Sequence, residues 1–75
     1  MEFIEWLEKE KGLSKKSSHD VASRFKRLQK ITNIDDIKTM DIDNIEKNSN
    51  FTNLSVSVKS QLRRSLVLMD EYSKL

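Results

Sequence analysis

The stretch SSHDVASRFKRLQKI, residues 17–31, decides the fold of this chain. Its apolar side chains recur every three or four residues, at Val21, Phe25 and Leu28, which is the period of an amphipathic α-helix with one buried face. Such a helix is stable only when its apolar stripe packs against other elements. We therefore predict a helix over about 15–31, packed against further helices.

The ends of this helix are marked by residues with known terminal preferences. Either Ser14 or Ser17 can accept the free N–H groups of the first turn, and Thr32-Asn33 ends the helix. Before it, Gly12 stands where a left-handed helix cap is needed, because glycine adopts that conformation without steric cost. A short helix over about 2–11 is thus predicted to stop at this glycine.

The rest of the chain also has helical spacing, and strands are not expected because the apolar residues almost never alternate. Short helices are predicted over about 35–39 and 42–48, the second capped by Asp41, and a loop over 48–50. Phe51 and Leu54 then pack back on the core, and Ser55 caps a last helix over about 56–73. The fold class predicted is all-α, a compact bundle of four to five helices. One core is expected, made of Phe3, Leu7, Val21, Phe25, Leu28, Ile45, Leu62, Leu66 and Met69.

Length and composition exclude several classes of protein. The 75 residues allow one domain, and the chain has no cysteine, so it forms no disulfide framework and no thiolate zinc site. A reducing, cytoplasmic location fits this composition best. No apolar run is long enough to span a membrane, and Glu2 and Glu5 follow Met1 where a secretory signal peptide would be basic.

Charge is unevenly distributed along the chain, although the net charge is only +2. Residues 15–32 carry six basic residues against one acid, and residues 55–75 carry four against two. Residues 1–14 and 33–54 are acidic, with net charges of −2 and −3. A surface of one sign can therefore exist on a nearly neutral protein. The alternative is that these charges only keep helix faces solvated.

The two long helices are predicted to turn basic faces away from the core. On the helix over 15–31, the side chains that lie opposite the apolar stripe or on the first turn are Lys15, Lys16, His19, Ser23, Lys26, Arg27 and Lys30. On the last helix they are Lys59, Ser60, Arg63, Arg64 and Val67. Arginine can bond guanine edges, lysine and serine can hold phosphates, and a small apolar group can touch a thymine methyl. Alternatively, Val67 is one of many singly exposed apolar residues and the two arginines only add solubility.

No pattern in the sequence supports catalysis or cofactor binding. His19 is the only histidine, so no metal site is expected, and no serine has the spacing of a catalytic triad. The single glycine excludes a phosphate-binding loop. We therefore predict a non-enzymatic chain with no cofactor, no metal, no small-molecule ligand and no membrane partner.

Two segments resemble a known family. FIEWL at 3–7 followed by GLSKKS at 12–17, and later LSVSVKSQLRRSL at 54–66, are similar to the first helices and the last helix of the N-terminal core-binding domain of phage integrases and other tyrosine recombinases. In that family an aromatic-rich first helix ends in a Gly-Leu-Ser turn, and the last helix starts at a Ser/Thr cap and carries arginine on its outer side. The resemblance covers nearly the whole chain through short motifs.

The resemblance implies a SAM-like helical domain that grips duplex DNA at a recombination site. It implies DNA contacts from Lys15, Lys16, Ser23, Lys26, Arg27, Lys30, Lys59, Ser60, Arg63 and Arg64. The family's catalytic Arg, His and Tyr set is absent, so residues 1–75 are expected to be one non-catalytic domain of a longer integrase-like protein, with the catalytic domain following. The alternative function is a helical protein-interaction module that docks a partner through the acidic region 33–54 or Val67. Contiguous basic faces on the two long helices would favour DNA, and faces that point apart would favour the alternative.

Overall fold

The computed structural model describes residues 2–36 and 40–75, and all regular secondary structure in these ranges is helical. The helices are α1 Phe3–Glu10, α2 Lys15–Thr32, α3 Ile42–Glu46, α4 Ser49–Thr52 and α5 Val56–Ser73. The prediction of an all-α bundle of four to five helices is confirmed. Within the described ranges, no helix combines the length and the apolar character that a membrane crossing requires.

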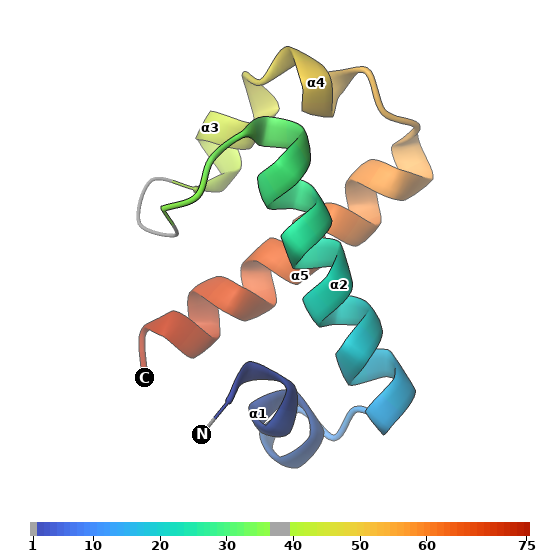
Figure 1. The fold of residues 1–75 in the computed structure, drawn as a ribbon, viewed down its shortest axis with the longest axis vertical. Coiled ribbons are helices and arrows are strands. Elements are labelled where there is room, and N and C mark those ends of the chain that lie inside the picture. The colour runs from blue at the N-terminus through green and yellow to red at the C-terminus, as the bar shows by residue number, and fades with distance from the viewer. Residues whose placement is uncertain (1, 37–39) are drawn as a thin grey trace.

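The two 18-residue helices, α2 and α5, cross at the centre of the molecule (Figure 1). The first helix, α1, lies at one end of this crossing, and the short helices α3 and α4 lie at the other. Phe25 and Leu28 of α2 share a buried cluster with Leu62 and Leu66 of α5. The crossing therefore buries the apolar stripe of each long helix against the other.

The predicted end signals of α1 and α2 and the predicted start of α5 are confirmed. The Ser14 hydroxyl accepts a hydrogen bond from the N–H of Ser17 at 3.1 Å, so Ser14 caps α2 and Ser17 belongs to its first turn. The Ser55 hydroxyl accepts from the N–H three residues further on, at 3.3 Å, and caps α5. Gly12 and Asn33 have φ angles of +65° and +59°, the left-handed conformation that stops a helix.

The region 33–54 follows the prediction only in part. Asp35 and Asp36 belong to no helix, and the remainder of the helix expected over 35–39, residues 37–39, lies outside the described residues. The helix expected over 42–48 is present but ends earlier, as α3. The Asp41 carboxylate caps it as predicted, because it accepts a hydrogen bond from the N–H of Asn44 at 2.8 Å.

The prediction of a loop over 48–50 is wrong, because Asn48 starts α4. Its side-chain oxygen accepts hydrogen bonds from the N–H groups of Asn50 and Phe51 at 3.0 and 3.3 Å. The amide nitrogens of Asn48 and Asn50 donate to the carbonyls of Thr32 and Ile31 at 3.1 and 3.2 Å. Those carbonyls end α2 and have no partner within the helix. The asparagines thus fix α4 to the end of α2, which holds Phe51 fully buried.

The expectation of one continuous core is also wrong, because the buried side chains form two clusters. The larger one contains Phe25, Leu28, Met40, Ile45, Phe51, Leu62 and Leu66. The smaller one contains Trp6, Leu7 and Val21, with Phe3 and Tyr72 packed against it. Phe3 and Met69 are only half-buried, whereas Met40 and Trp6, absent from the expected list, are buried. The cause is the crossing of α2 and α5. The first helix, α1, packs over one end of this crossing, and α3 and α4 pack over the other end.

Ser18 is the one fully buried polar side chain in the described ranges whose hydroxyl has no hydrogen-bond partner. We expect Ser18→Ala to stabilise the protein by about 1–2 kcal/mol, because the variant removes an unsatisfied hydroxyl and alanine is the better helix former. Urea denaturation followed by the fluorescence of Trp6 measures this change. Ser65→Ala is the matched control: Ser65 is equally buried, but its hydroxyl donates to the carbonyl of Leu62 at 2.7 Å. The interpretation is contradicted if Ser18→Ala is the more destabilised of the two variants.

Candidate nucleic-acid interface

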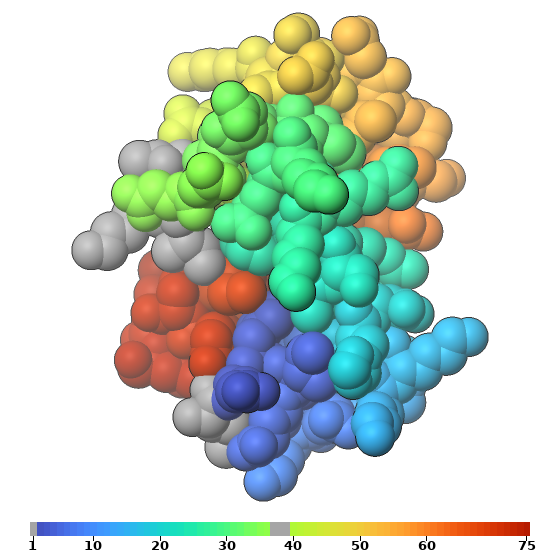
Figure 2. Space-filling model, in the orientation of Figure 1, coloured from blue at the N-terminus to red at the C-terminus, as the bar shows by residue number. Residues whose placement is uncertain are grey.

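The predicted basic face of α2 lies on the protein surface. Lys15, Lys16, Ser23, Lys26, Arg27 and Lys30 are all exposed, as is His19. Val21, Phe25 and Leu28, the stripe used to predict this face, are buried. In Figure 2, α2 crosses the front of the molecule and forms much of the visible surface. From Lys16 to Lys30 the face is about 21 Å long at 1.5 Å per residue. We call the seven exposed residues the α2 basic face.

The cations of the α2 basic face have no ion pair with any described residue. The four ion pairs in the described ranges are Lys9–Glu5, Lys11–Glu71, Arg63–Glu46 and Lys74–Asp70, and none involves α2. The only acid on α2 is Asp20. The positive charge of this face is therefore available to an anionic partner.

Arg24 extends the positive charge of α2, although the sequence reasoning did not count it among the site residues. It is half-buried at the edge of the helix, and with Asp20, Ser23 and Arg27 it lines a shallow hollow of about 270 Å³. The helical wheel gave only a weak signal for it, because Arg24 lies between the buried and the exposed sides. A single phosphate can be held in such a hollow between two guanidinium groups.

On α5, the four predicted residues do not share one environment. Ser60 and Arg64 are exposed, whereas Lys59 and Arg63 are half-buried. The Arg63 Nε donates a hydrogen bond to the Glu46 carboxylate at 2.5 Å. Its guanidinium carbon also lies 5.4 Å from the centre of the Phe51 ring. Arg63 therefore joins α5 to α3 and α4, and its charge is already partnered.

The Arg63–Glu46 pair shifts the titration of both groups. The hydrogen bond from Arg63 lowers the pKa of the Glu46 carboxyl group below its usual value and raises that of the guanidinium. A lowered carboxyl pKa stabilises the fold at pH values above the unfolded pKa, and this contribution is lost as the pH falls through the folded pKa. We expect Arg63→Gln to raise the pKa of Glu46, as measured by carboxyl-carbon NMR titration. An unchanged Glu46 titration would show that the pair does not persist in solution.

The structure does not bring the basic faces of α2 and α5 together. Because Phe25 and Leu28 of α2 and Leu62 and Leu66 of α5 share one buried cluster, helical periodicity directs the faces opposite them to opposite sides of the helix pair. Ser60 and Arg64 are exposed, and helical periodicity places them opposite the buried Leu62 and Leu66 of α5. One straight duplex that lies along the α2 basic face therefore does not reach Ser60 and Arg64. By the criterion given in the sequence analysis, this arrangement favours the protein-interaction alternative, and a DNA contact has to rest on α2 alone.

No set of three or more His, Cys, Asp or Glu side chains that could hold a metal ion occurs in the part of the chain that the structure describes. Compared with known proteins, the chain matches no family model, no curated protein and no solved structure.

Proposed function

We propose that this chain is a non-catalytic DNA-binding domain that holds duplex DNA through the α2 basic face. The observation that carries this proposal is the exposed row of cations on α2 that have no ion pair among the described residues. Lysine and arginine neutralise backbone phosphates, and the release of counterions then drives binding. The absence of cysteine is compatible with the cytoplasm, which is the location that we propose.

Duplex DNA is favoured over a single strand because the aromatic rings are used inside the fold. Trp6, Phe25 and Phe51 are buried, and Phe3 packs against Tyr72 with 5.3 Å between ring centres. Single-strand binding relies on exposed rings on which bases stack. An exposed helix face without phenylalanine, tyrosine or tryptophan suits the major groove of B-form DNA, which is about 12 Å wide and admits one α-helix.

The resemblance to integrase core-binding domains supplies the biological setting that we propose, a recombination site bound by a longer recombinase. The proposed contact is narrower than the resemblance implies. The proposed DNA contact is made by α2. Arg63 has a structural role, and Arg64 can contact DNA only if the DNA bends around the molecule.

Amide chemical-shift mapping with a 20-base-pair duplex tests this proposal. We expect the largest changes at Lys16, Ser23 and Arg27, with α3 and the end of α5 unchanged. An unlabelled single strand of the same sequence is the control, and it should bind more weakly. Shifts confined to residues 40–46 and Val67 would contradict the proposal.

That outcome would support the second candidate, a protein-interaction module. Its specific support is a notch of about 240 Å³ between α3 and α5. Ile42 and Val67, which are 40% and 54% exposed, both line it, together with Asp41 and with the ion pair of Asp70 and Lys74. An exposed apolar notch of this kind suits an apolar segment of a partner protein.

A further inference from the structure

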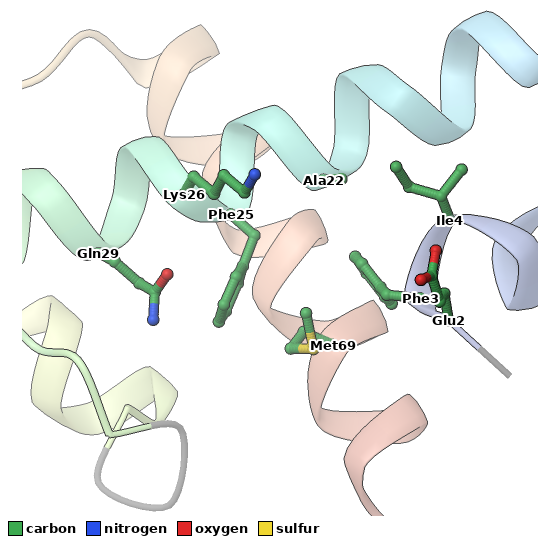
Figure 3. Close-up of a pocket in the computed structure, with 8 residues that line it drawn as sticks. All are labelled: Glu2, Phe3, Ile4, Ala22, Phe25, Lys26, Gln29 and Met69. Atoms are coloured by element: carbon green, nitrogen blue, oxygen red, sulfur yellow. The ribbon is translucent and has the colours of Figure 1, made fainter.

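An apolar groove of about 330 Å³ lies between α1, α2 and α5 (Figure 3). Its lining residues are Glu2, Phe3, Ile4, Ala22, Phe25, Lys26, Gln29 and Met69. Phe3 packs against the smaller buried cluster, whereas Phe25 and Met69 belong to or pack against the larger one. The groove therefore lies between the two buried clusters, at a place where their side chains do not pack against each other.

Each of the three helices turns an apolar edge toward this groove. Figure 3 shows Phe3 and Ile4 on the α1 side, Phe25 of α2 across the open space from them, and Met69 on α5. Ala22 contributes a small side chain at the edge of α2, which lets another backbone approach closely. A groove between helices is filled most efficiently by the side chains of another helix, packed at an interaxial distance of about 8–10 Å.

The charges at the groove are asymmetric. Lys26 stands at the α2 edge, and Glu2 stands near the α1 edge. Lys15 lies on the same side of α2 as Lys26, because eleven residues make about three turns, and Lys30 follows Lys26 by one turn. None of these lysines has an ion pair with a described residue. An occupant that places carboxylates along α2 is therefore electrostatically complementary to the groove.

We propose that this groove binds an acidic amphipathic helix of a partner protein. The apolar side chains of that helix contact Ile4, Phe25 and Met69, and its carboxylates lie along the lysines of α2. The Gln29 side chain adds a polar contact at the edge: its amide nitrogen donates to the carbonyl of Asp35 at 3.1 Å, which leaves its oxygen as an acceptor. This interaction needs no nucleic acid, but it uses Lys15, Lys26 and Lys30 of the α2 basic face, so the partner helix and duplex DNA compete for this side of α2.

The experiment uses two synthetic 16-residue helical peptides with the same leucine stripe, one flanked by glutamates and the other by lysines. Each is titrated into the protein without DNA, and the methyl resonances of Ile4, Ala22 and Met69 are followed by NMR. We expect saturable shifts of these methyl groups with the glutamate peptide only. Lys26→Glu should weaken that peptide by roughly tenfold, which corresponds to about 1.4 kcal/mol, and should improve binding of the lysine peptide.

Ala22→Gln tests the shape of the groove with little risk to the fold, because Ala22 is half-buried and glutamine is a good helix former. It should weaken the glutamate peptide, whereas Ser57→Gln on the exposed side of α5 should not. Equal binding of both peptides overturns the proposal. The proposal is also overturned if Ser23 and Arg27 shift while the methyl resonances of the groove do not change, since the peptide then binds only as a polyanion. Shifts that grow with protein concentration alone also overturn it, because the occupant is then a second copy.

Discussion

Replacement of Phe51 by alanine is expected to destabilise the protein by about 3–5 kcal/mol, the usual result when a fully buried phenylalanine is truncated. The Phe51 side chain is 0% exposed and comes from the four-residue helix α4. The loss is comparable with the whole stability of a domain of this size, roughly 4–11 kcal/mol at 0.05–0.15 kcal/mol per residue. The variant should therefore be largely unfolded at room temperature, as measured by circular dichroism and by Trp6 fluorescence.

Two further variants keep this prediction testable if Phe51→Ala does not fold. Phe51→Leu retains most of the volume, so it should remain folded with a smaller, measurable loss. Val56→Ala is the control on the surface, since Val56 is 74% exposed and its truncation should change the free energy of unfolding by less than about 0.5 kcal/mol. A loss below about 1 kcal/mol for Phe51→Ala would show that α4 does not seal the larger cluster.

The second large effect concerns DNA binding. The double variant Lys26→Ala/Arg27→Ala should weaken duplex binding by roughly thirty- to a hundredfold near 0.1 M salt, because each lost phosphate contact removes about one unit of the salt slope. Stability should barely change, since both side chains are exposed. Fluorescence anisotropy with a labelled duplex measures the affinity.

The matched control removes the same charge elsewhere. Lys9→Ala/Lys74→Ala also lowers the net charge by two. Both lysines are exposed, and each pairs with an acid one helical turn earlier in the chain. If the α2 basic face binds DNA, this control loses far less affinity than the α2 variant. Equal losses would mean that only the net charge matters, and would refute a localised binding face.

The long helices could be predicted from the sequence because their signals are local. The apolar stripe of α2 and the caps at Ser14 and Ser55 are all set within one or two helical turns. The region around Asn48 could not be predicted in the same way. An asparagine suits a loop and a helix cap equally, and α4 forms where the end of α2 offers carbonyls that Asn48 and Asn50 can bond.

The candidate site shows the same difference between features set by local sequence and features set by packing between helices. The exposure of Lys26 and Arg27 follows from the period of one helix, so a wheel suffices to predict it. The role of Arg63 depends on Glu46, 17 residues away, and on Phe51. Only the packing of α5 against α3 and α4 brings these groups together. The opposed directions of the two basic faces likewise depend on how the helices cross.

The salt dependence of duplex binding by the unmodified protein tests the central claim most directly. A fluorescent duplex is titrated at several salt concentrations between 50 and 200 mM, conditions over which contacts to phosphates weaken strongly. With about four to six phosphate contacts, log K should fall linearly with log salt with a slope of about −4 to −5, and non-specific Kd values near 10⁻⁴–10⁻⁶ M are expected at physiological salt. Binding that is absent at 50 mM salt, or that does not change with salt, would contradict the assignment of the α2 basic face to DNA.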